Sequence, residues 1–120
     1  MVLGYWIVAG LLALFYLYAG VKKVAQSREQ LAPMMKWVQA VPMPVVRFIG
    51  AVEILGAAGL ILPPATGRTP VLAIAAAVGF AVLQVLAAGL HLSRGEVKET
   101  SLNVVLIASA AVAAWLATAL

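Results

Sequence analysis

The chain has 120 residues, of which 65% are hydrophobic and only 10% are charged, and its mean hydropathy is +1.10. A water-soluble domain carries about 25% charged residues, so this composition excludes an ordinary soluble domain and favours an integral membrane protein in contact with lipid. The net charge of +4 sits at the ends of apolar runs, where it fits attraction to lipid headgroups, and we expect no nucleic-acid partner.

Four apolar runs, each about as long as a bilayer-crossing helix, predict an all-α protein: a four-transmembrane-helix bundle that forms one domain over residues 1–120. The predicted spans cover about residues 2–21, 45–62, 71–92 and 102–120. The first run lacks a preceding basic segment and is long for a signal-peptide core, so we interpret it as a retained helix. Near its start, Tyr5 and Trp6 are typical of an aromatic belt at a membrane surface. The second run ends at Pro63 and Pro64, which predict a turn.

The loop between the first two spans is not featureless. From Leu31 to Val41, apolar residues alternate with Lys36 and Gln39 at roughly helical spacing, and Pro33 suits a first helical turn. This pattern predicts a short amphipathic interfacial helix. Two roles are compatible with the pattern: a surface helix anchored by Trp37, or a lid over a cavity.

Lysine and arginine residues concentrate in the first and third loops, residues 22–44 and 93–101, whereas the second connection carries only Arg68. Cytoplasmic loops of membrane proteins carry an excess of these two residue types. We therefore expect both basic loops to be cytoplasmic and both termini to lie outside, in a multi-pass protein of the cytoplasmic membrane.

Glu53 places a carboxylate inside the second predicted span, where exposure to lipid would cost at least about 2.5 kcal/mol. Such a residue normally faces the protein interior and has a partner, for which Lys23 and Arg47 are candidates. Gln84 lies at a similar predicted depth on the third span, and His91 follows it two helical turns later on the same face. We therefore expect Glu53, Gln84 and His91 to share one interior cluster.

The complete polar cluster predicted for the half of the bundle nearest the basic loops consists of Lys23, Arg47, Glu53, Gln84, His91, Asn103 and Tyr16. Glu53 either forms an ion pair that fixes helix register or handles protons or a ligand. Gln84 either bridges helices or contacts a ligand, and His91 either caps a helix C-terminus or titrates near neutral pH. One histidine and one intramembrane glutamate are too few for a metal site. Without cysteine, the chain itself forms no disulfide or iron–sulfur cluster.

Three sequence elements resemble those of the DoxX-like family of small bacterial four-helix membrane proteins. They are a Gly-x-x-Lys element in Ala19–Lys23, Gly-x-x-Glu-x-x-Gly-x-x-Gly-Leu in Arg47–Pro63, and His-x-x-Arg-x-Glu in His91–Glu96, with Asn103 at the expected start of the fourth helix. The resemblance implies the four-helix fold and a bacterial inner-membrane location. It also places Lys23, Arg47, Glu53 and His91 at positions that the family shares.

The leading hypothesis is a membrane protein that binds a lipophilic small molecule, with a quinone as the candidate, as a subunit of a redox system with a partner protein. Glu53 and His91 would be the catalytic residues, and the cofactor-binding residues would be Lys23, Arg47, Gln84, Asn103, Tyr16 and Trp37. One alternative is a stand-alone acid–base enzyme, isomerase-like, with Glu53 as base. Another is a structural or assembly module. A homodimer is compatible with the small-residue stripes.

Overall fold

The computed structural model describes residues 2–67 and 70–120, and within these ranges the protein is helical and contains no strand. The elements are α1 (Val2–Ala25), α2 (Arg28–Leu31), the 3-10 helix η1 (Lys36–Ala40), α3 (Met43–Ala65), α4 (Pro70–Ser93) and α5 (Val97–Ala117). In the described part of the chain, α1, α3, α4 and α5 are long and apolar enough to cross a membrane. The predicted all-α bundle is therefore confirmed.

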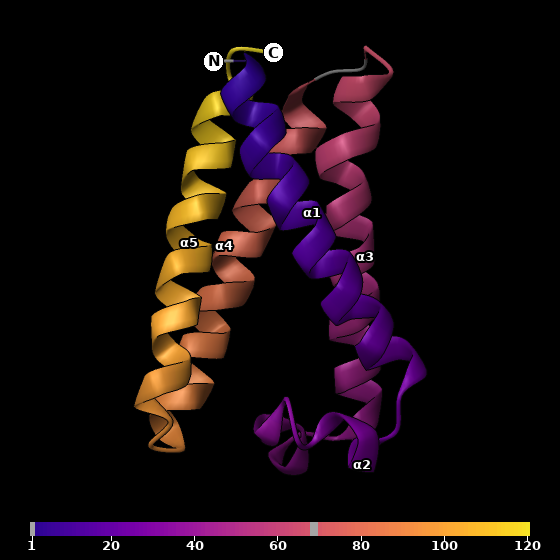
Figure 1. The fold of residues 1–120 in the computed structure, drawn as a ribbon, viewed down its shortest axis with the longest axis vertical. Helices are drawn as coiled ribbons and strands as arrows, with labels where there is room; N and C mark the ends of the chain where they lie inside the picture. Colours follow the sequence, from indigo (N-terminus) through magenta and orange to yellow (C-terminus); the bar gives the residue numbers. More distant parts are fainter. Residues whose placement is uncertain (1, 68–69) are drawn as a thin grey trace.

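The four long helices form a closed ring in which α1 contacts α3 and α5, and α4 contacts the same two helices. Both termini lie at one end, and α2, η1 and the α4–α5 turn lie at the other, which we call the loop end (Figure 1). Helix α1 crosses the bundle obliquely. It lies near α5 at the terminal end and against α3 at the loop end (Figure 1).

The long helices extend beyond the predicted spans. Helix α3 continues through Pro63 and Pro64 to Ala65, so the turn begins later than predicted. At the end of the helix, the Thr66 hydroxyl donates to the Leu62 carbonyl at 2.9 Å. Helix α5 starts at Val97, five residues before the predicted span. Hydropathy reports which residues suit lipid, whereas helical hydrogen bonding continues into polar segments outside it. Arg68 lies outside the described residues.

The first loop contains two short helical pieces around the predicted amphipathic segment Leu31–Val41. A capping box at Ser27 starts α2 earlier: the Ser27 side chain accepts from the Gln30 N–H, and the Gln30 side chain accepts from the Ser27 N–H. Pro33 has no N–H to continue the helical ladder, so it follows the end of α2 instead of opening a helix. The amphipathic segment is thus divided between the end of α2 and the 3-10 helix η1, so the predicted short helix in this loop is present but covers only part of residues 31–41.

The loop packs back onto the bundle. Leu31 of α2 and Val38 of η1 are fully buried with Val46 of α3 in a small apolar cluster. The Arg28 guanidinium donates to the Val38 carbonyl, which ties α2 to η1. The segment therefore covers the loop end of α3.

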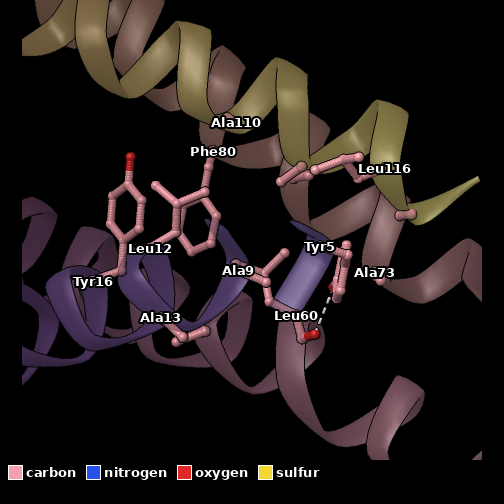
Figure 2. Close-up of a cluster of buried hydrophobic side chains, with 14 of the residues drawn as sticks. Tyr5, Ala9, Leu12, Ala13, Tyr16, Leu60, Ala73, Phe80, Ala110 and Leu116 are labelled. Atoms are coloured by element: carbon pink, nitrogen blue, oxygen red, sulfur yellow. Dashed lines mark hydrogen bonds between the residues drawn. The ribbon is translucent and has the colours of Figure 1, made fainter. Parts of the chain in front are cut away.

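The main apolar core joins all four long helices, and its members lie from the middle of these helices toward the terminal end; Figure 2 shows a close-up of it. Its buried members are Tyr5, Ala9, Leu12, Ala13, Tyr16, Ala57, Leu60, Ala73, Ala77, Phe80, Leu106, Ala110, Ala113, Leu116 and Ala117. Tyr5 is fully buried, and its hydroxyl donates to the Leu60 carbonyl at 2.6 Å (Figure 2). Assignment of Tyr5 to a surface belt was therefore wrong, because α3 supplies the acceptor that its hydroxyl needs.

Large apolar side chains cover the outside of the bundle. Those at least 60% exposed on the helices include Leu3, Leu11, Leu14, Phe48, Leu55, Leu62, Val71, Leu86, Val97 and Trp115. In water such a surface would drive aggregation, whereas lipid solvates it. The long helices therefore contact membrane lipid.

Helices α1 and α3 approach most closely where Gly20 faces Gly50. A Cβ added at Gly20 would lie 2.7 Å from the Gly50 carbonyl oxygen, and one added at Gly50 would lie 2.7 Å from Cβ of Lys23. Only glycine fits this crossing, because backbone atoms stand where a side chain would begin.

Replacing Gly20 by alanine should force α1 and α3 apart and destabilise the protein by about 1–3 kcal/mol, the usual cost of overpacking. The matched control is Gly10→Ala on the same helix, where an added Cβ meets nothing within 4 Å. Thermal unfolding of the purified protein in detergent measures both. Equal midpoints for the two variants would show that the crossing does not constrain the fold.

Candidate functional site

A buried ion pair joins α1 to α3 at the glycine crossing. The Lys23 ammonium lies 2.5 Å from Oε1 of Glu53, and the two residues are only 7% and 2% exposed. Lys23 and Glu53 meet there because Gly20 and Gly50 let the two backbones touch. Both the hydrogen bond and the ion pair use Oε1 alone, so the second carboxylate oxygen has no hydrogen-bond donor in the described chain.

Arg47 fastens the start of α3 to the end of α1. Its Nη1 donates to the carbonyls of Lys23, Val24 and Gln26 at 2.7, 2.8 and 2.5 Å. The last carbonyls of a helix have no partner within the helix and carry partial negative charge, so a guanidinium there is doubly favourable. Arg47 is thus not the partner of Glu53 and acts on the backbone that carries Lys23.

Trp37 covers the ion pair from the loop. Its ring lies 5.6 Å from the Lys23 ammonium, within cation–π range, and η1 presents it there. The buried side chain of Val38 and the bond from Arg28 hold η1 in place. The loop segment that contains η1 therefore lies over the charged residues.

A second polar group links α1, α4 and α5 through one amide. Gln84 Nε2 donates to the Tyr16 hydroxyl at 2.9 Å, and Asn103 Nδ2 donates to Gln84 Oε1 at 2.7 Å. The Tyr16 ring stacks on Phe80 with the centroids 3.7 Å apart, which fixes the hydroxyl at the boundary of the apolar core (Figure 2). Oδ1 of Asn103 is buried and has no hydrogen-bond partner among the described residues.

His91 lies in the last turn of α4, next to the turn that leads to α5. Gly95, with φ +73°, ends α4, and the Glu96 N–H closes the turn onto the His91 carbonyl at 2.8 Å. Oε1 of Glu96 lies 3.3 Å from Nδ1 of His91 and accepts from Arg94 at 2.9 Å. Burial raises the pKa of Glu96, but the hydrogen bonds and charges of Arg94 and His91 outweigh it and hold that pKa below its usual value.

The structure divides the predicted cluster into three groups. Glu53 joins Lys23 beneath Trp37; Tyr16, Gln84 and Asn103 form one hydrogen-bonded chain; and His91 pairs with the loop residue Glu96. No hydrogen bond in the described chain connects His91 to Glu53. The first two groups are neighbours, because Glu53 packs against Gly20, one helical turn from Tyr16.

Three residues in or beside these polar groups were not predicted from the sequence. Phe80 has no polar atom to mark it, yet it holds the Tyr16 ring. Gln26 carries a second buried acceptor, Oε1, that lacks a partner in the described chain, and its position just past the basic pair gave no signal. Glu96 stands in the His-x-x-Arg-x-Glu element, and this spacing could have indicated its contacts with both basic residues.

Four long apolar helices with charged and amide side chains buried between them define a multi-pass membrane protein. The chain belongs to the DoxX-like family, whose family model matches residues 7–113. No curated protein and no solved structure matches the chain.

Removing one member of the buried pair should cost more than removing both, because a lone buried charge is left unpaired. We expect Lys23→Met and Glu53→Leu each to destabilise the protein by about 3 kcal/mol and the double variant to be more stable than either. Denaturant unfolding in detergent micelles measures the three values. Lys22→Met, which removes a neighbouring lysine bonded only to the Tyr18 hydroxyl at 3.4 Å, is the control. A double variant as unstable as the sum of the two singles would contradict the pairing.

The turn at Glu96 should lose stability in acid. Since the pKa of Glu96 is lowered in the folded protein, its contribution is complete above the ordinary carboxyl value of 4.5 and disappears as pH falls through the lower folded value. Glu96→Gln should flatten this part of the stability profile, measured by thermal unfolding between pH 7 and pH 3. Glu99→Gln, on the exposed first turn of α5, is the control and should keep the wild-type slope.

Proposed function

We propose that this DoxX-like protein binds a lipophilic small molecule between its helices at the loop end, with a quinone as the candidate, and serves as the membrane subunit of a redox system. The observation that supports the proposal is the distribution of its buried side chains. The apolar cluster occupies the terminal half, while the buried Lys23, Glu53, Gln84, His91 and Asn103 lie toward the loop end. Ionisable groups at membrane depth are by default functional.

The groups present fit an oxygen-bearing headgroup. The amide oxygen Oδ1 of Asn103 is buried and unpaired, as expected where a ligand completes the hydrogen bonding, and the Glu53 carboxylate uses only Oε1 in its bond to Lys23. Tyr16 and Lys23 supply donors beside them, and Trp37 shields the site from the loop side. Glu53 would hold or release a proton at its carboxylate when the headgroup changes protonation.

A bound quinone would supply the electron chemistry. The chain has no cysteine and a single histidine, so it offers neither an iron–sulfur ligand set nor a histidine pair for haem. Electrons would come from a partner protein. In this proposal His91, with Glu96, would exchange protons at the loop end, and the basic loops would face the cytoplasm.

A structural role is the second candidate. It is favoured by the Lys23–Glu53 pair itself, which sits at the Gly20–Gly50 crossing and satisfies two charges without any ligand. In that case the pair would fix helix register, and Glu53→Gln would change stability or assembly without changing ligand binding.

Ligand binding should raise thermal stability. A short-chain ubiquinone at 100 times its dissociation constant would add about 2.7 kcal/mol to the unfolding free energy of purified wild-type protein, which is a shift of several degrees. The control ligand is an isoprenoid hydrocarbon of the same length without the ring. We expect Glu53→Gln to reduce the quinone shift and Ser109→Ala, on the α5 surface, to preserve it.

No stabilisation of the wild type by the quinone, or the same stabilisation by the hydrocarbon, would overturn the proposal. An equal quinone shift in wild type and Glu53→Gln would favour the structural role for the ion pair.

A further inference from the structure

The Tyr16–Gln84–Asn103 chain has one open end, and that end is at Asn103. Gln84 uses both of its amide atoms, one toward Tyr16 and the other toward Asn103. Asn103 is only 5% exposed, and it uses one amide atom while the other has no partner in the described chain. A buried amide atom without a partner calls for a ligand group or a bound water.

The open end can present either kind of hydrogen-bonding group. As the contacts stand, Asn103 donates to Gln84, Gln84 donates to Tyr16, and the open atom is the acceptor Oδ1. If both amides rotate by a half-turn, the Tyr16 hydroxyl donates to Gln84, Gln84 donates to Asn103, and the open group is the donor Nδ2. Both directions keep the same two bonds within the chain, so neither loses a contact.

The surroundings limit what can reach this end. Asn103 lies six residues into α5, about 9 Å along the helix from its start, and is buried, so the group that meets it must enter between the helices. On the same helix pair, an apolar groove of about 450 Å³ runs between Ala81 and Val85 of α4 and Ala110 and Ala114 of α5. A lipophilic tail can lie in such a groove, since it carries no polar group that would need solvation.

We propose that Asn103 binds the headgroup oxygen of the lipophilic ligand, accepting from a hydroxyl in one direction of the Tyr16–Gln84–Asn103 chain and donating to a carbonyl in the other. This inference rests on the proposed function and deepens it: the ligand class becomes an uncharged headgroup whose oxygen alternates between carbonyl and hydroxyl, as in a quinone and its reduced form. Tyr16 is a positioning residue that supplies or takes back one hydrogen bond as the chain reverses.

The test is equilibrium binding of a short-chain ubiquinone and of its reduced form to the full-length protein in lipid nanodiscs. Wild type should bind both forms, and Asn103→Leu should weaken both by about tenfold, the loss expected for one hydrogen bond. Tyr16→Phe removes the hydroxyl that terminates the chain and keeps the ring on Phe80. Because either direction of the chain uses one hydrogen bond between Gln84 and the Tyr16 hydroxyl, this variant should weaken the binding of both forms. Ser109→Ala should leave both affinities unchanged.

Infrared spectroscopy provides a second readout, and its wild-type measurement does not depend on any variant folding. With ¹³C-carbonyl-labelled quinone bound, the labelled band should shift to lower wavenumber than in an apolar solvent, and Asn103→Leu should return it to the unbonded position.

Wild-type binding with an unshifted carbonyl band, or with unchanged affinity in Asn103→Leu, would mean that only a water meets Asn103; it would overturn this inference and leave the proposed function standing. Failure of wild type to bind either form would overturn both.

Discussion

The Lys23–Glu53 pair is the constraint on which the loop half of this bundle depends. A charge buried at membrane depth needs an oppositely charged partner. The 2.5 Å contact between the Lys23 ammonium and Glu53 Oε1 is possible because Gly20 and Gly50 let α1 and α3 touch. The same crossing sets the oblique path of α1, which leaves α3 on one side and reaches α5 at the terminal end (Figure 1). Electrostatics and backbone proximity thus specify one geometry together.

The interior of the bundle changes from apolar to polar along its length. In the terminal half, Tyr5, Phe80 and small alanines pack without a buried charge, and this half supplies the apolar stabilisation. Toward the loop end, the interior holds amide and charged groups whose hydrogen bonding is incomplete at Glu53 and Asn103. Tyr16 joins the two halves, because its ring packs in the apolar core and its hydroxyl bonds to Gln84.

The sequence predicted what hydropathy and charge can reveal. The four helices and the inward position of Glu53 stand out because lipid leaves few alternatives for a long apolar run or for a carboxylate within one. Hydropathy and charge did not decide whether Lys23 or Arg47 is the ion-pair partner of Glu53, because that depends on which side chain fits beside the Gly20–Gly50 crossing. The burial of Tyr5 and the turn that aims Glu96 at His91 arise from tertiary contacts and local helix-end geometry, which no periodicity records.

Arg47 has a consequence for how the polypeptide is assembled. Its three bonds to carbonyls at the end of α1 fasten that helix to the start of α3 independently of residues 27–42, the stretch that joins them covalently. The two helices are therefore also held together by a contact that does not pass through the connecting peptide. A change in the length of the exposed part of this connection would leave the contact between the end of α1 and the start of α3 in place.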